Sequence, residues 1–308
     1  MIQRLLPFFT LIALFIGLAI ASPRAFLSAT NLSTVVRQTA VINIMALGMT
    51  MIIISGGIDL SVGAILAMGG VLGTMAMQHG YPIPVGVAVG ILAGMFWGLA
   101  NGLLITRLKI APFIVTLGTL GIVRGLTLVI TNGLPIHEIP RGFSFLGEGA
   151  FLGLPFVLYI LIACALAVHV ILEHTKLGRY IFAIGSNQDA AYYAGIPVAF
   201  HTSAVYAICG MLTGLAGMIE ASRLMTGQPT AGQNYELQAI AAVVIGGGSL
   251  RGGEGGVMGT LIGAFIMGLL SNGSDLLGIP PFYQQVIIGC VIILAVTVDE
   301  LRKRRSSR

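Results

Sequence analysis

The chain has 308 residues, of which 56% are hydrophobic and only 9% are charged, and its formal net charge is +5. Soluble domains carry about 25% charged residues, so this sequence has too little charge to cover a water-facing surface. The apolar residues come in long runs, as in membrane helices, and do not alternate as in the strands of a membrane barrel. We therefore expect an all-α polytopic membrane protein that forms a single transmembrane domain over residues 1–308.

The reactive residue types argue against other functional classes. The basic residues are scattered at the ends of apolar runs, so we expect no nucleic-acid partner. The three cysteines, Cys164, Cys209 and Cys290, are odd in number and widely spaced, so neither a disulfide nor a metal site is expected. The five histidines are dispersed along the chain, so no catalytic cluster is expected either.

About ten apolar segments follow one another, each of a length suited to a membrane helix except the eighth. That segment is short and runs into glycines, so we expect a half-helix or re-entrant piece that the rest of the protein buries. The first segment ends in Ala19-Ile20-Ala21, which is similar to a signal-peptidase site, but we interpret the segment as an uncleaved helix. The segments cover roughly residues 5–21, 39–54, 60–77, 83–106, 112–131, 154–172, 202–221, 237–250, 255–273 and 281–298.

The distribution of lysine and arginine predicts the orientation. The basic tail from Arg302 to Arg308 is expected to be cytoplasmic, and with ten spans the N-terminus is then cytoplasmic too. On this topology eleven basic residues lie inside and four lie outside. Two of the outer ones, Arg24 and Arg37, fit this topology poorly because both fall in the first outer loop. The inner set includes Arg107, Lys109, Lys176, Arg179 and Arg251, and the outer set is completed by Arg141 and Arg223.

Glycine recurs at four-residue intervals in two segments. One series runs from Gly86 to Gly98 and the other includes Gly210, Gly214 and the nearby Gly217. Small residues at this spacing let membrane helices approach closely. We expect both series to be packing surfaces, either within one subunit or between two subunits.

The longest cytoplasmic loop, residues 173–201, has the signals of a short helix. Ser186 and Asp189 have the spacing of a capping box, Gly195 suits the left-handed residue after a helix end, and Pro197 prevents continuation. Between them lie small residues beside two tyrosines, which form a compact face for docking into a groove. The local pattern is equally compatible with a helix that lies on lipid head groups.

Four blocks, in order over nearly the whole chain, resemble the permeases of ribose-type ABC importers, the group that includes the ribose, xylose, arabinose and autoinducer-2 systems. One block is the loop sequence GRYIFAIGSNQDAA from Gly178, followed by Ala194-Gly-Ile-Pro197. The other blocks are SGGIDLSVG from Ser55, KIAPFIVTLGTLG from Lys109 with Arg124-Gly125, and the long stretch formed by QPTAG from Gln228, YELQAIAAVVIGGGSLRGG from Tyr235 and GTLIGAF from Gly259.

This resemblance implies a type II importer-like fold and a division of labour between subunits. Two permease subunits, identical or different, pair in the bacterial inner membrane. A periplasmic sugar-binding protein delivers the solute to this pair. ATP and Mg²⁺ bind to an ATP-binding subunit, present as two copies or a fused tandem, so this chain binds no cofactor and is no enzyme. The loop then couples to that subunit through Ser186, Asn187, Asp189, Ala190, Ala191, Ala194 and Gly195.

The glycine-rich stretch from Gly246 to Gly256 is not a phosphate-binding loop. Such a loop needs a lysine after glycine, and none of the three lysines follows a glycine. We interpret the stretch as a turn between membrane segments.

Polar residues inside apolar segments are candidates for the substrate pathway, because such residues usually face a partner or a cavity. We expect Asp59 to cap the third segment with Ser61 nearby, and Asn43 and Asn101 to form interhelical hydrogen bonds. Arg124 must find a carboxylate or carbonyl groups, and Glu220 is a candidate partner unless it pairs with Arg223. The substrate-pathway candidates are Asn43, Asp59, Gln228, Asn234, Gln238 and Asn272.

The alternative to an ATP-driven importer is a secondary transporter driven by an ion gradient. Such proteins also contain broken helices near the membrane midplane, as the short eighth segment suggests. A coupling-ion site would need acidic residues within the spans, and few are present.

Overall fold

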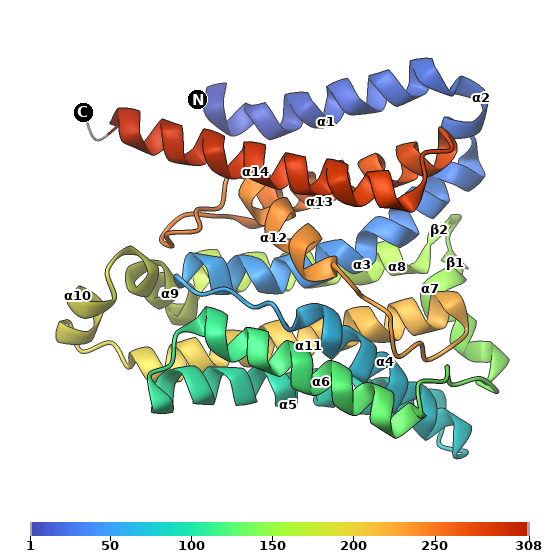
Figure 1. The fold of residues 1–308 in the computed structure, drawn as a ribbon, viewed down its shortest axis with the longest axis horizontal. Helices are drawn as coiled ribbons and strands as arrows, with labels where there is room; N and C mark the ends of the chain where they lie inside the picture. Colours follow the sequence, from blue (N-terminus) through green and yellow to red (C-terminus); the bar gives the residue numbers. More distant parts are fainter. Residues whose placement is uncertain (1, 307–308) are drawn as a thin grey trace.

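A computed structural model describes residues 2–306, which form a bundle of helices lying roughly side by side (Figure 1). Six of the described helices are long and apolar enough to cross a membrane: α3, α5, α6, α8, α11 and α13. The helices are α1 (Ile2–Ala21), α2 (Pro23–Phe26), α3 (Ala29–Ile54), α4 (Val62–Gln78), α5 (Ile83–Leu108), α6 (Pro112–Thr131), α7 (Phe145–Glu148), α8 (Phe156–His174), α9 (Lys176–Ser186), α10 (Gln188–Tyr193), α11 (Val198–Leu224), α12 (Tyr235–Ile245), α13 (Val257–Leu276) and α14 (Pro281–Ser306).

The core lies around α3 and α11, which are surrounded by other helices along most of their length. Side chains of α3 are buried on all faces from Thr39 to Ile54. In contrast, α5, α6 and α8 bury a single stripe and expose large apolar side chains such as Phe96, Ile114 and Leu166. Helices that are apolar all round but buried on one stripe are suited to contact lipid with the remaining surface.

The glycine series join helices within this one subunit. Gly94 and Gly98 of α5 face Gly210 of α11 so closely that a methyl group on any of the three would collide with a backbone carbonyl of the opposite helix. Gly217 of α11 lies equally close to the backbone of Leu66 in α4. Close backbone approach of this kind is the role expected for small residues in membrane helices, so α4, α5 and α11 form one tightly packed unit.

Each apolar segment predicted from the sequence contains one helix, but the boundaries differ most at α3. The prediction began this segment at residue 39, whereas α3 begins at Ala29, where the Ser28 side chain accepts a hydrogen bond from Asn31 N. Residues 29–38 are less apolar than the rest of α3. The apolar run therefore did not predict the first turns of this helix.

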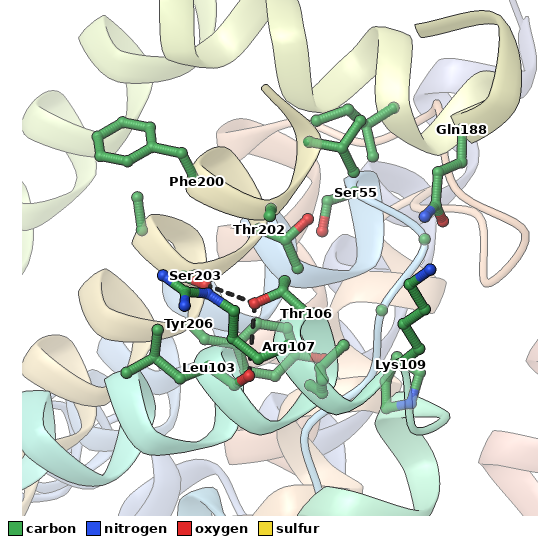
Figure 2. A pocket seen from close by; sticks show the side chains of 18 of the residues that line it. Ser55, Leu103, Thr106, Arg107, Lys109, Gln188, Phe200, Thr202, Ser203 and Tyr206 are labelled. Carbon is green, nitrogen blue, oxygen red and sulfur yellow. Dashed lines mark hydrogen bonds between the residues drawn. The ribbon is translucent and has the colours of Figure 1, made fainter. Parts of the chain in front are cut away.

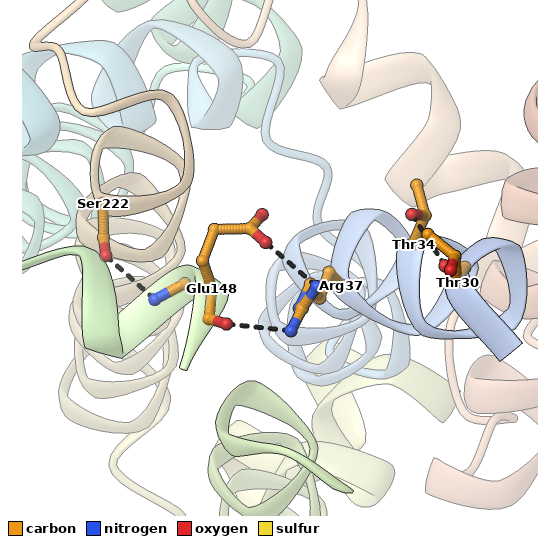
Figure 3. A network of polar contacts seen from close by, with 6 residues as sticks. Thr30, Thr34, Arg37, Glu148 and Ser222 are labelled. Atoms are coloured by element: carbon orange, nitrogen blue, oxygen red, sulfur yellow. Dashed lines mark hydrogen bonds and ion pairs between the residues drawn. The ribbon is translucent and has the colours of Figure 1, made fainter. Parts of the chain in front are cut away.

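Arg37 was predicted to lie in the first outer loop, and this prediction is wrong. Arg37 is part of α3. Its Nη1 lies 2.9 Å from Glu148 Oε2, and its Nη2 donates to the Glu148 carbonyl at 2.8 Å (Figure 3). The neighbouring Gly147 N donates to Ser222 Oγ of α11 at 2.8 Å. The short helix α7 is thus fastened to both α3 and α11, and the ion pair explains how an arginine is accommodated at this end of the bundle.

The segment between α6 and α8 contains elements that the sequence did not predict. A 3₁₀ turn at Arg141–Ser144 precedes α7, and two antiparallel strands of two residues each follow it, β1 (Ala150–Phe151) and β2 (Leu154–Pro155). Among the described residues, this hairpin and an isolated bridge between Ile136 and Gly227 make up the β-structure, and the rest of the chain consists of helices and the turns and irregular segments that join them. These pieces cap one end of the bundle (Figure 1).

The opposite end of the bundle carries α9 and α10, together with both termini (Figure 1). The helical part of the basic tail ends at Ser306, and Arg308 lies outside the described residues. Helix α12, the predicted half-helix, has 11 residues. At 1.5 Å per residue it is about 16 Å long, which is roughly half of an apolar bilayer core.

Candidate functional site

The loop between α8 and α11 contains two helices, α9 and α10, where the sequence predicted one. Helix α9 begins after Thr175, whose side chain accepts a hydrogen bond from Gly178 N at 3.3 Å. It is closely packed, because Gly185 lies directly against the carbonyl of Ile54 at the end of α3. Ring contacts between Tyr180 and His201, with centroids 4.8 Å apart, join α9 to α11.

The cap of α10 is Asn187, and the prediction that Ser186 caps this helix is wrong. Asn187 Oδ1 accepts a hydrogen bond from Ala190 N at 2.9 Å. Ser186 is the last residue of α9, and its hydroxyl donates to the Phe182 carbonyl at 2.9 Å. A serine hydroxyl near a helix end often bonds back to its own helix, so the neighbouring asparagine is left to start the next helix.

The end of α10 confirms the predicted role of Gly195. This residue has φ +81°, and its N–H donates to the Tyr192 carbonyl at 3.0 Å. The N–H of Ile196 donates to the Ala191 carbonyl at 3.1 Å. These two bonds form a Schellman motif, which glycine suits because it carries no Cβ.

The surface of α10 is formed mainly by two aromatic side chains. Tyr192 and Tyr193 are 68% and 86% exposed, and their rings contact each other edge to face. Ala191 is 4% exposed and packs inward, so it supports the helix from below and offers no docking surface. The other residues predicted to couple to a partner are exposed: Ser186, Asn187, Asp189, Ala190, Ala194 and Gly195.

A buried polar network occupies the break between α3 and α4. Asp59 is fully buried, and its Oδ1 accepts hydrogen bonds from Ser61 N at 2.8 Å and Ser61 Oγ at 2.6 Å. Asn101 of α5 donates to Ser61 Oγ at 2.8 Å. Asp59 therefore stabilises the turn before α4. The prediction that Asp59 caps the first turn of α4 is wrong, because it accepts its hydrogen bonds from Ser61 and not from the N–H groups of that turn. The predicted interhelical role of Asn101 is confirmed.

A second polar connection joins this break to α11. Tyr206 of α11 is fully buried, and its hydroxyl donates to the Ile58 carbonyl at 3.0 Å. Tyr206 was not among the residues predicted from the sequence, because it lies in an apolar run with no neighbouring motif. A tyrosine that is surrounded by apolar residues usually has a hydrogen-bond partner when buried, and this was the only signal available.

Arg124 of α6 reaches the irregular segment between α11 and α12. It donates to the carbonyls of Pro229 at 2.7 Å and Ala231 at 2.8 Å, and also to Gly63 O of α4 at 3.2 Å. Carbonyl groups are therefore its partners. Glu220 pairs with Arg223 at 3.0 Å, which is the local alternative that the sequence allowed.

The predicted substrate-pathway residues do not form one cluster. Asn272 forms two hydrogen bonds with Asn31 of α3, at 2.9 and 3.1 Å, and Asn43 bonds only the Thr39 carbonyl of its own helix among the described residues. Gln228 bonds Thr230 at 2.9 Å, and Asn234 starts α12 in a left-handed conformation. Gln238 is half-buried on α12, and its N–H donates to the Asn234 carbonyl at 3.3 Å.

A cavity of about 1110 Å³ opens at the end of the bundle that carries α10. It lies between the turn from α5 to α6 and the segment from α10 to α11 (Figure 2). Thr106 and Ser203 form a hydrogen bond of 3.1 Å in its wall, and Tyr206 lines its inner part. None of the predicted pathway residues lines this cavity.

Comparison with known proteins gives a consistent result. A protein family described as "Branched-chain amino acid transport system / permease component" matches residues 31–296. The chain belongs to this permease family. It is 46% identical over 299 residues to the ribose import permease protein of Bacillus subtilis, covering 96% of this chain and 92% of the relative.

Other relatives carry related names. The D-allose transport system permease protein of Escherichia coli is 37% identical, with 91% of this chain and 86% of the relative covered. The L-arabinose ABC transporter permease protein of Azospirillum brasilense is 35% identical, with 96% and 86% covered. No solved structure matches the chain. The resemblance to ribose-type permeases is thus confirmed, and the chain is a multi-pass membrane component of a transport system.

Proposed function

We propose that the chain is the membrane-spanning permease subunit of an ATP-driven importer and that its solute is a sugar. The supporting observation is the identity to ribose, allose and arabinose permeases, which extends over almost the full length of both partners. The family description mentions amino acids, but the relatives at 35–46% identity carry sugar names. A neutral sugar is also compatible with a membrane domain whose buried polar residues are mostly hydroxyls and amides.

The proposed topology has ten passes, with both termini in the cytoplasm. The chain reverses direction after each of the helices α1, α3, α4, α5, α6, α8, α11, α12 and α13, and α14 makes the last pass (Figure 1). In this topology α12 crosses half of the membrane, and the irregular residues 225–234 supply the rest. Arg124 bonds the carbonyls of Pro229 and Ala231, and Gly63 of α4 packs directly against Gly232. These contacts support the proposal, because non-helical backbone at this depth must be paired with or covered by protein.

The proposed partners act on the two ends of the bundle. An ATP-binding subunit, as two copies or a fused tandem, docks on α10, and ATP with Mg²⁺ binds to that subunit alone. A second permease, identical or different, pairs with this chain in the bacterial inner membrane, and a periplasmic binding protein delivers the sugar at the opposite end. The two exposed tyrosines of α10 support the docking role, since tyrosine is enriched at the centre of protein interfaces.

Movement at α10 has a direct route into the membrane helices. Helix α10 contacts α9, and α9 meets α3 at Gly185 and α11 at the Tyr180–His201 ring pair. Helix α11 in turn packs closely on α4 and α5 through glycine. A shift of α10 is therefore transmitted to rigid helices and not absorbed by a flexible loop.

Affinity purification from the native membrane, followed by identification of what copurifies, tests the proposal. We expect an ATP-binding subunit with the wild-type chain, and its loss in the Tyr192→Ala, Tyr193→Ala double variant. Tyr81→Ala is the matched control, because Tyr81 is 58% exposed beyond the end of α4. Absence of an ATP-binding subunit with the wild-type chain would contradict the proposal, and its retention by the double variant would contradict the docking role of α10.

A further inference from the structure

The cavity beside α10 contains cationic side chains and no anionic one. Arg107 and Lys109 both line it, and no aspartate or glutamate is among its lining residues. Within the part of the chain that the structure describes, neither cation forms an ion pair. A cavity with two positive charges and no internal counter-charge favours an anionic occupant.

These two cations lie at the depth of lipid head groups. Arg107 is in the last turn of α5, and α6 begins at Pro112. Both helices are long and apolar enough to span a bilayer, so the turn between them lies where the apolar core of the membrane ends. Basic pockets between membrane helices at this level bind the phosphate groups of anionic lipids.

The backbone of Lys109 supports a functional role for its position. Lys109 ends α5 with φ +54°, a left-handed conformation that glycine or asparagine adopts at lower cost. A non-glycine residue kept in this conformation indicates a local constraint that often accompanies function. The conformation places the Lys109 side chain beside the cavity, on the side of α10 (Figure 2).

The remaining walls suit the rest of a lipid molecule. Leu99 and Leu103 of α5 and Phe200 of α11 are apolar lining residues with 36%, 41% and 69% exposure, respectively. They form an apolar surface that continues along α5 toward the membrane interior. Thr106 and Ser203 add hydroxyl groups at the level of the head group.

We propose that this cavity is a binding site for one anionic phospholipid. Its head group lies in the part of the cavity to which Arg107 and Lys109 contribute positive charge from opposite sides (Figure 2), and one acyl chain follows Leu99 and Leu103 along α5. Because Gln188 and Tyr192 of α10 also line the cavity, the bound lipid contacts the helix that we propose as the docking element. The site thus links the composition of the membrane to the position of α10.

Lipid binding to the purified transporter, kept with all subunits that copurify, tests this proposal without depending on transport. Native mass spectrometry counts retained molecules during titration with phosphatidylglycerol or phosphatidylcholine. The test variant combines Arg107→Gln with Lys109→Asn, because asparagine tolerates the left-handed backbone at residue 109. The matched control combines Lys176→Gln with Arg179→Gln, which removes two exposed cations of α9 at the same end, outside the cavity.

We expect the wild-type protein to retain phosphatidylglycerol in preference to phosphatidylcholine. The test variant should bind phosphatidylglycerol roughly 30-fold more weakly, since each basic residue near an anionic head group contributes about a factor of five, and the control should bind like the wild type. Equal weakening in the control would overturn the proposal. Equal binding of the two lipids by the wild-type protein would also overturn the proposal. Displacement of phosphatidylglycerol by millimolar glycerol 3-phosphate would overturn it too, and would assign the site to a soluble phosphate.

Discussion

Arg124, in α6, donates a hydrogen bond of 2.7 Å to the backbone carbonyl of Pro229, a residue 105 positions further along the chain. The same guanidinium also bonds Ala231 O and Gly63 O. One charged side chain thus joins α6, the start of α4 and the irregular segment before α12. This arrangement lets a non-helical piece of backbone persist between membrane helices.

Substitution of Arg124 should therefore destabilise the fold. We expect Arg124→Gln to lower the free energy of unfolding by at least about 3 kcal/mol, because three carbonyls lose a charged donor. Thermal unfolding of the purified chain in detergent measures the effect. Arg24→Gln, at an exposed position in α2, is the control and should leave the midpoint unchanged. An unaltered midpoint for Arg124→Gln would show that the three bonds do not hold this region.

Two neighbouring substitutions distinguish the observed cap of α10 from the predicted one. Asn187→Ala removes the acceptor for Ala190 N and should destabilise α10 by about 1 kcal/mol. Ser186→Ala removes only a bond back to α9 and should have little effect on α10. Hydrogen exchange of the amides in residues 188–193 is the measurement, and faster exchange in Ser186→Ala than in Asn187→Ala would contradict the assignment.

The close packing of α5 on α11 predicts a large effect for a single methyl group. In Gly98→Ala the new Cβ collides with the Tyr206 carbonyl, and we expect a loss of about 1–3 kcal/mol in the free energy of unfolding. Gly17→Ala in α1 is the control, because no atom lies within 4 Å of its new Cβ. Unfolding in increasing denaturant compares the two variants. Equal stability would mean that α5 and α11 are further apart than described.

The amide pair of Asn31 and Asn272 can be tested with a double-mutant cycle. Each side chain donates to the other, at 3.1 and 2.9 Å, so the two residues should be energetically coupled. We expect a coupling energy of about 1 kcal/mol from the unfolding of Asn31→Ala, Asn272→Ala and the double variant. A coupling energy near zero would contradict the paired arrangement, and loss of uptake in Asn272→Ala alone would then support the prediction that Asn272 lies on the substrate pathway.

The sequence predicted the membrane class, the family and the position of every apolar helix, because these depend on run length and on contiguous motifs. The role of Gly195 was also predictable, since left-handed geometry after a helix strongly favours glycine. The sequence could not predict whether Ser186 or Asn187 caps α10, because both residue types cap helices well. The position at which α9 ends determines which of the two side chains is available as the cap.

Contacts between distant residues were harder to predict. Asn272 was predicted as a pathway residue for its polarity alone, and no motif indicated that Asn31 would occupy both of its hydrogen-bonding groups. Arg37 fitted an outer loop poorly, and its pairing with Glu148 depends on how α7 folds back on α3. The cavity at the α10 end likewise arises from four segments, and none of them has a recognisable motif for an occupant.

We propose that this chain forms the pathway of an importer driven by ATP hydrolysis in a partner subunit. The most direct measurement is uptake of labelled ribose, allose and arabinose by proteoliposomes that contain the purified transporter and its binding protein. We predict uptake of at least one sugar that requires ATP and continues when ionophores abolish all ion gradients. Uptake that persists without ATP and stops with the ionophores would contradict this account and establish a secondary transporter.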